Sequence, residues 1–346
     1  MGSTDTSLSK PLLGSLVSVA LALTSFLATT SSVRTLVPLP SQGTIQGKLE
    51  HFFEHGDEYD IALFGTSRVF SGLNPVVIEA ELATHGIEAR VFNLGLPAVG
   101  AYEVDYYFRK ILDGDFERLR LVLVEAWWGL PISLDRNAFT ERRVEWHTAR
   151  QTIAAARAAL TEPSWGWKER LKQAGGHLQL FGWRFVNYGR GADLLSPRPP
   201  PVIEEDGGTQ GYRPWVKGAG HRGAENRGKP LSWSRPKVPA SQLDTGVDFA
   251  LYSEQAELAR ANQLRLVHVM MPGNREPFPV AELRSQVSRL IDYRPPPPGR
   301  EGKLAHLAFL NDPALHLDNL HLTEEGASRF SQLVAGDLAR MLKTTD

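Results

Sequence analysis

The 346-residue chain contains no cysteine. This absence excludes disulfide bonds, thiolate zinc sites and a cysteine nucleophile, and it also removes the residue type from which a redox compartment is usually inferred. A covalent nucleophile in this chain must therefore be an oxygen or an amine.

The chain also lacks an excess of charge of either sign. Its 38 basic and 39 acidic residues give a formal net charge of −1. It therefore lacks the excess of positive charge with which proteins bind nucleic acid phosphates. We therefore expect no nucleic acid partner. With 42% apolar residues, a chain of this length can form one sizeable α/β core plus an insertion, or two small domains.

Charged residues are absent from residues 12–33 near the N-terminus. This apolar segment is at the lower edge of the length that crosses a ~30 Å hydrocarbon core at 1.5 Å per residue. It predicts an uncleaved signal anchor or a cleaved signal peptide in residues 1–34, with a buried globular helix as the remaining alternative. A linker and lead-in then covers residues 35–58. Lys10 and Arg34 flank the segment, so positive charge does not decide its topology.

Beyond the linker, strand and helix patterns alternate along the chain. We predict strands at residues 59–64, 89–94, 119–124 and 264–271, and a weaker strand at 304–310. Helical spacing of apolar residues occurs at 76–85, 102–112, 249–263 and 323–343. Helices between successive strands require right-handed crossovers. The expected fold is therefore a three-layer α/β/α sandwich with a parallel sheet.

The alternation stops over residues 130–248, which are rich in arginine, glycine and proline. We interpret this segment as an insertion or lid subdomain that divides the core into residues 59–129 and 249–346. All eight tryptophans lie between Trp127 and Trp233, either as a lid that stacks on sugars or as the small core of a helical subdomain. Because the insertion leaves the sheet at its carboxyl edge, we expect it to border a site there.

A candidate nucleophile follows the first predicted strand. In the sequence FGTSRVF, Ser67 lies between that strand and the next segment, and Gly65 lets the backbone turn sharply. A hydroxyl nucleophile needs exposure and donors directed at the developing oxyanion, which the amide of Ser67 or Arg68 could supply. The alternative is an ordinary helix cap. Arg68 could hold an anionic substrate group or pair with a carboxylate.

The second predicted strand ends in FNLGLPAVG, where Asn93 and Gly95 occupy the turn. A glycine has no Cβ, so Gly95 can bring a backbone amide close to a ligand. An ordinary turn between a strand and a helix is the alternative.

A candidate base lies near the C-terminus in LHLDNLHLTEEGASRF. Asp318 and His321 are three residues apart, before a helix that Thr323 can cap. At this spacing, the carboxylate can fix one imidazole nitrogen while the other nitrogen faces the nucleophile. We predict that Ser67, Asp318 and His321 meet at the carboxyl ends of the strands; a solvated loop is the alternative.

Together, the three motifs resemble the SGNH (GDSL-like) hydrolase superfamily. The GTSR turn, the N-terminal hydrophobic segment and the long insertion are similar to exported SGNH-like proteins associated with polysaccharide O-acetylation. The resemblance implies a flavodoxin-like SGNH fold, with Ser67 as nucleophile, His321 as base and Asp318 as its orienting carboxylate. It also implies that the amides of Ser67 and Gly95 form the oxyanion hole, and that no cofactor or metal is needed.

Two departures from the family pattern affect this assignment. The residue before the serine is Thr66, where many members have aspartate. The Gly-x-Asn-Asp block after the third strand is absent, and residues 125–129 read Glu-Ala-Trp-Trp-Gly instead. The indole of Trp127 is a candidate replacement for the missing donor, or else a packing residue. With Trp127, we take Arg68 and Asn93 as candidate substrate-binding residues.

A competing motif precedes the first strand. Residues 51–55, HFFEH, match the H-x-x-E-H zinc pattern and place His51 and His55 one helical turn apart. This pattern would indicate a metalloprotease, but no downstream helix offers a clear third ligand. We therefore favour histidines on the surface of an amphipathic helix.

The expected function is acyl-ester chemistry outside the cytoplasm. The resemblance implies a membrane-anchored hydrolase or O-acyltransferase, secreted if the signal is cleaved, acting on a short acyl ester of envelope carbohydrate. A membrane-bound O-acyltransferase is its candidate partner. Hydrolysis and transfer share the first half-reaction, so the sequence does not separate them. The alternative is a non-catalytic SGNH-like binding or assembly component of a polysaccharide modification machine.

Overall fold

The structure is a computed structural model of the chain. It describes residues 10–36, 44–97, 99–114, 116–126, 141–162, 165–187, 210–214, 249–272, 280–296, 302–318 and 320–344.

A parallel sheet of five strands forms the centre of the molecule, and its strand order is β2-β1-β3-β4-β5. The strands are β1 Ile61–Gly65, β2 Val91–Gly95, β3 Leu121–Glu125, β4 Arg265–Met270 and β5 Leu290–Asp292. Because β1 pairs with both β2 and β3, the last residues of these three strands, Gly65, Gly95 and Glu125, lie close together at one edge.

Helices cover both faces of the sheet, and successive residues of each strand pack against opposite faces. On β1, Ile61 and Leu63 belong to one buried cluster, whereas Ala62 and Phe64 belong to the other. This alternation explains why the strands are apolar throughout. The helices of the first face are α3 Ser67–Gly72, α4 Pro75–Thr84 and α13 Glu324–Lys343. Those of the second face are α2 Thr44–His55, α5 Ala101–Leu112 and α11 Ala250–Ala261.

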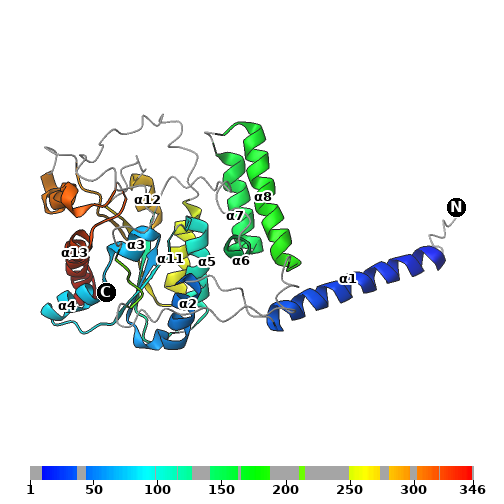
Figure 1. Cartoon of the computed structure of the whole chain (residues 1–346), viewed down its shortest axis with the longest axis horizontal. Coiled ribbons are helices and arrows are strands. Elements are labelled where there is room, and N and C mark those ends of the chain that lie inside the picture. The colour runs from blue at the N-terminus through cyan, green and yellow to red at the C-terminus, as the bar shows by residue number, and fades with distance from the viewer. Residues whose placement is uncertain are drawn as a thin grey trace, which may run out of the picture.

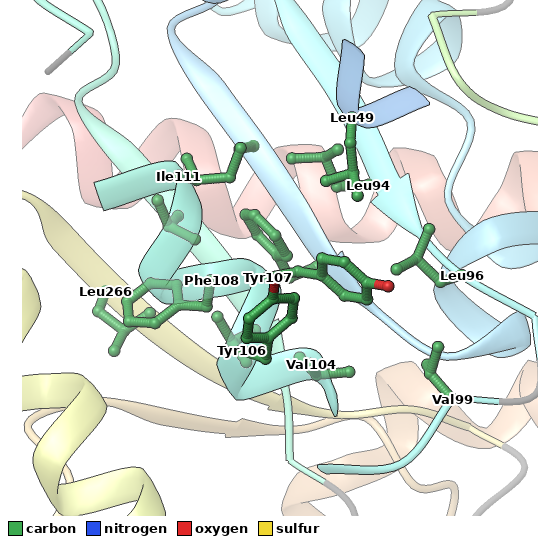
Figure 2. Packing of buried hydrophobic residues seen from close by; sticks show 14 of the residues in the cluster. Leu49, Leu94, Leu96, Val99, Val104, Tyr106, Tyr107, Phe108, Ile111 and Leu266 are labelled. Carbon is green, nitrogen blue, oxygen red and sulfur yellow. The ribbon is translucent and has the colours of Figure 1, made fainter. Parts of the chain in front are cut away.

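The second face is packed by aromatic residues of α5, as Figure 2 shows. Tyr107 and Phe108 are almost completely buried there, against Leu94 and Leu96 at the end of β2 and Leu266 of β4. The predicted mixed α/β fold with a parallel sheet and helices on both faces is therefore confirmed.

The prediction of a strand at residues 304–310 was wrong. The segment lies in η3 Gly302–Asn311, a 3₁₀ helix, followed by a second, η4 Pro313–Leu315. The backbone of η3 is kinked at Leu304, and beyond the kink the buried side chains of Leu307 and Leu310 are three residues apart, which matches the three residues per turn of a 3₁₀ helix. The fifth strand is instead β5, which follows α12 Val280–Gln286 and has only three half-buried residues. So short an edge strand leaves no clear periodic pattern.

The N-terminal apolar segment forms one helix, α1 Lys10–Leu36. Residues Leu12–Val33 are long and apolar enough to cross a membrane, and none of this span is buried against the rest of the chain. Figure 1 shows α1 projecting away from the α/β core. The helix is compatible with a membrane anchor or a signal sequence. Between it and β1, α2 is followed by a short 3₁₀ turn, η1 Gly56–Glu58.

Within the predicted insertion, the structure describes three helices and one short segment. The helices are α6 Glu141–Trp146, α7 Ala149–Thr161 and α8 Trp167–Phe185. Helices α7 and α8 form an antiparallel hairpin beside α5 (Figure 1). Trp146 is buried, whereas Trp167 is 68% exposed. The described tryptophans therefore divide between packing and surface positions.

Candidate active site

The three residues expected to act together meet at the carboxyl edge of the sheet. Ser67 begins α3, two residues after the end of β1. Asp318 and His321 lie in the loop before α13, which packs directly against α3. Although 254 residues separate Ser67 from His321, their side chains are hydrogen-bonded.

The three side chains form a continuous hydrogen-bonded chain. His321 Nε2 lies 2.8 Å from Ser67 Oγ. On the other side of the ring, His321 Nδ1 lies 2.8 Å from Asp318 Oδ2 and 3.0 Å from Oδ1. With the proton of neutral His321 assigned to Nδ1, Asp318 accepts that hydrogen bond, and Nε2 accepts the hydrogen bond from the Ser67 hydroxyl. Ser67 is half-buried, and His321 and Asp318 keep 16% and 27% of their side chains exposed.

Asp318 also organises the loop that carries the histidine. Its Oδ1 accepts the amides of Leu320 at 2.7 Å and His321 at 2.8 Å. Burial by itself would raise the pKa of Asp318. Hydrogen bonding and electrostatic attraction to His321, together with these two amides, outweigh burial and lower the pKa to about 2. Asp318 is therefore ionised at neutral pH and holds the imidazole through both side chain and backbone.

The start of α13 holds the end of the loop that carries Asp318 and His321. Thr323 caps the helix by accepting the Gly326 amide at 3.1 Å, as the sequence predicted for Thr323. A Cβ on Gly326 would lie 2.2 Å from the carbonyl oxygen of Leu315 in η4. Glycine is therefore needed for the close contact between α13 and the segment leading into the Asp318 loop.

The nucleophile turn is held by a residue that the sequence analysis did not assign to the site. Glu125 at the end of β3 accepts the Thr66 amide on Oε2 at 2.7 Å. Thr66 in turn caps α3, because its Oγ1 accepts the Arg68 amide at 3.2 Å. Thr66 thus shapes the turn on both sides of Ser67.

The structure does not support Arg68 as a substrate-binding residue. Its side chain is 3% exposed, and Nη2 lies 2.5 Å from Oε1 of Glu125, whose side chain is 1% exposed. A buried arginine needs such a carboxylate, since an unpaired buried charge is very unfavourable. Arg68 therefore balances the charge of Glu125 beneath the turn, and its amide is occupied by Thr66.

Asn93 also differs from expectation, because it is completely buried. Its Nδ2 donates to the carbonyl oxygens of Val69 at 2.8 Å and Leu73 at 2.7 Å, in α3 and its C-cap. Its side chain therefore anchors the nucleophile helix to β2 and does not face a substrate.

Gly95, expected as an oxyanion donor, has its amide engaged. The amide donates to Asn93 Oδ1 at 2.7 Å. A Cβ at this position would lie 2.2 Å from the backbone nitrogen of Phe70, so glycine here allows α3 to approach β2. The expected close approach exists, but the partner is the protein's own backbone. The Ser67 amide, at the first position of α3, has no acceptor within its own helix and remains the candidate donor.

Lys48 of α2 is a second residue that the sequence analysis missed. Its side chain is buried, and Nζ donates to the carbonyl oxygens of Asn93 at 2.9 Å and Gly95 at 2.8 Å. The ammonium also lies 4.3 Å from the centre of the Phe70 ring. It joins the segment before β1 to the same strand end that contacts α3. A single lysine in a short amphipathic helix carries no sequence signal for this role.

Residues 210–214, within the predicted insertion, lie beside β2 and α3. The carbonyl oxygen of Gln210 accepts the Asn93 amide at 2.9 Å on edge strand β2, and the Arg213 amide donates to the Phe70 carbonyl oxygen at 3.4 Å. Arg142 of α6 forms a 2.5 Å ion pair with buried Glu103 and donates to the Pro97 carbonyl oxygen at 3.0 Å. Trp127, the candidate extra donor, lies outside the described residues.

The H-x-x-E-H motif does not assemble a metal site. His51 Nε2 lies 3.0 Å from the Tyr59 hydroxyl, and His55 Nδ1 lies 3.1 Å from Glu58. Among the residues that the structure describes, no three histidine or carboxylate side chains are grouped so as to hold a metal ion.

Comparison with known proteins adds no relative: no protein-family model matches the chain, and no curated protein matches it.

Proposed function

We propose that the chain is an SGNH-type serine acyl hydrolase or O-acyltransferase that works through an acyl-serine intermediate. The observation that carries the proposal is the Ser67–His321–Asp318 chain, with 2.8 Å on each side of the imidazole. A half-buried serine at the carboxyl edge of a parallel sheet, with an oriented histidine beside it, is suited to nucleophilic attack. The strand order and the motifs support an SGNH variant of the flavodoxin-like fold.

In the first half-reaction, Ser67 Oγ attacks the acyl carbonyl carbon while His321 Nε2 takes the hydroxyl proton. The C–O bond to the leaving alcohol then breaks, and His321 returns the proton to that oxygen. Ionised Asp318 stabilises the imidazolium that forms between these steps. The Ser67 amide is placed to donate to the oxyanion.

In the second half-reaction, water or a sugar hydroxyl attacks the acyl-serine, with His321 as base, and Ser67 recovers its proton. Water would give hydrolysis, and a sugar would give transfer. Exclusion of water by the insertion would favour transfer. We place the reaction outside the cytoplasm, on a short acyl ester of envelope carbohydrate, with α1 as the membrane anchor and a membrane-bound O-acyltransferase as the candidate partner.

One observation favours a second candidate, a non-catalytic SGNH-like binding or assembly component. The Gly95 amide is engaged by Asn93, and the Gly-x-Asn-Asp block is missing, so the oxyanion would have fewer donors than the family pattern implies. Loss of one such donor usually costs on the order of 10²–10³ in kcat. A weakly reactive or unreactive serine would fit this alternative.

Covalent labelling with an activated phosphonate tests the proposal. Trypsin cleavage after Lys48, Arg68 and Arg90 places Ser67 and Ser71 in different peptides, each with a single serine. We expect the phosphonate adduct on the peptide of residues 49–68 and none on residues 69–90. The Ser67→Ala variant should lose the adduct. A folded wild-type chain without an adduct on Ser67 would favour the binding component.

A further inference from the structure

The outer surface of the α7–α8 hairpin exposes large apolar side chains. Their exposed fractions lie between 45% and 68%. The residues are Ile153 and Leu160 of α7, and Trp167, Leu171, Leu178 and Phe185 of α8. Exposed apolar residues are normal singly, but six on one hairpin indicate an interaction surface.

The spacing on α8 places its apolar residues along one side of the helix. Leu171, Leu178 and Phe185 are seven residues apart, so they fall on nearly the same face. Gly175 and Gly182 alternate with them, and nothing lies within 4 Å of a Cβ built on either glycine. This stripe is distinct from the residues of α8 that are buried against the hairpin, Gln173, Ala174, His177 and Leu180.

The hairpin is also basic. Residues 149–187 contain six basic and two acidic residues, a net charge of +4. The other 32 basic and 37 acidic residues give the rest of the chain a net charge of −5. Lys168 follows Trp167, the first residue of α8, and Lys172, which pairs with Glu169, follows Leu171. Positive charge beside an apolar stripe is the pattern of helices that lie in a membrane interface.

The end of the hairpin contacts α1. Asn187, just after α8, donates from Nδ2 to the carbonyl oxygen of Thr30. Thr30 is three residues before the end of the Leu12–Val33 span. In Figure 1, α8 stands on the side of the molecule from which α1 projects, and runs across the direction of α1. A bilayer crossed by α1 would therefore pass close to α8.

We infer that the α7–α8 hairpin lies on the same phospholipid bilayer that α1 crosses, with the α8 stripe in contact with the acyl-chain boundary and its basic residues at anionic headgroups. Charge decides between lipid and a second copy of the chain. Two basic hairpins facing each other would repel, whereas an anionic leaflet attracts Lys and Arg side chains near its surface. The inference does not depend on the chemistry of Ser67.

Single-cysteine labelling tests the inference in the full chain, because the native sequence has no cysteine. The chain is reconstituted through α1 into vesicles that contain anionic lipid and brominated acyl chains. An environment-sensitive fluorophore is attached at Leu178→Cys on the stripe. The matched control is Val76→Cys on α4, which is 49% exposed and lies at the opposite end of the molecule (Figure 1). Leu21→Cys in α1 reports insertion.

We expect the label at Leu178 to shift its emission to shorter wavelength and to be quenched by the brominated lipid, as at Leu21, with less quenching in vesicles without anionic lipid. The label at Val76 should show neither effect. A blue-shifted but unquenched label at Leu178 would mean that protein covers the stripe, and would overturn the inference. A label at Leu178 that neither shifts nor is quenched, like the label at Val76, would also overturn the inference. So would an unquenched label at Leu21.

Discussion

Glu125 Oε2 accepts the Thr66 amide at 2.7 Å, so the carboxylate that ends β3 holds the residue directly before Ser67. The other oxygen of Glu125 lies 2.5 Å from Arg68 Nη2, on the residue directly after Ser67. Ser67 is therefore flanked by two contacts to one buried carboxylate. Glu125 does not contact Ser67 itself and is a positioning residue.

Removal of Glu125 should destabilise the fold and misplace the nucleophile. We expect Glu125→Ala to lower the free energy of unfolding by about 3–5 kcal/mol, because it leaves Arg68 buried without a carboxylate. The double variant Arg68→Met/Glu125→Ala should recover part of that loss. Denaturant unfolding measures both, with Glu254→Ala as the control, since Glu254 is an exposed ion-pair partner worth about 0–1 kcal/mol.

The milder Glu125→Gln variant separates positioning from folding. Its amide oxygen can still accept the Thr66 amide, but the negative charge beside Arg68 is lost. If the proposed function is correct, kcat on an ester should fall while KM stays close to the wild-type value. An unchanged kcat in a variant with reduced stability would show that Glu125 serves folding alone.

Substitutions of the base should have large and unequal effects on ester turnover. We expect His321→Ala to lower kcat/KM on the order of 10²–10⁴-fold, because no other described side chain is bonded to Ser67 Oγ. Asp318→Asn removes the acceptor that fixes the imidazole, and should lower kcat more than KM. His51→Ala serves as the control, since His51 contacts Tyr59 away from the site. If His51→Ala lowered ester turnover as much as His321→Ala and Asp318→Asn do, the assignment of His321 as the base would be contradicted.

Two glycines of α13 should respond to alanine in opposite directions. In Gly326→Ala the new Cβ would lie 2.2 Å from the Leu315 carbonyl oxygen, which should separate α13 from η4 and loosen the Asp318 loop. We expect lower stability and lower turnover. Gly336→Ala meets nothing within 4 Å and should stabilise the chain by about 0.4–1 kcal/mol. Thermal unfolding of both variants tests this contrast. Equal shifts of the melting temperature in the two variants would contradict it.

The sequence predicted the sheet well, because four of its strands are short, mostly apolar runs separated by helical patterns. It also predicted that Asp318 and His321 would reach Ser67, and the basis was the order of the three motifs along the chain, since the loop that carries Asp318 and His321 follows η4 and not a strand. It did not reveal that Asn93 and Gly95 face α3. A polar residue at a strand end looks the same whether its partner is a ligand or the protein's own backbone. Only the path of α3 across β2 distinguishes the two cases.

Glu125 could have been found from the sequence. It ends the third strand, at the edge that carries Ser67, and a charged residue directly after four buried apolar residues needs a partner. Arg68 was the available one. The three-residue strand β5 could not be predicted, because its pairing with β4 sets its conformation.

The last prediction concerns the stability of the fold at acidic pH, and it follows from two buried histidines. Burial lowers the pKa of His147 to about 3, opposed by its hydrogen bond to the Arg143 carbonyl oxygen and assisted by the charges of His177, Arg143 and Arg184. Burial also lowers the pKa of His268 to about 3. Both stay neutral in the folded chain at pH 5.5, whereas in the unfolded chain they bind protons below their ordinary pKa of 6.5.

Stability should therefore fall as the pH drops from about 6.5 toward 3, because the unfolded state binds more protons. Well below pH 6.5, each histidine contributes a slope of up to about 1.4 kcal/mol per pH unit. Denaturant unfolding at pH 7.5, 6.5 and 5.5 should show a smaller slope for His147→Gln than for the wild type, whatever its stability at pH 7.5. A wild-type slope in His147→Gln would show that His147 is protonated in the folded chain at these pH values.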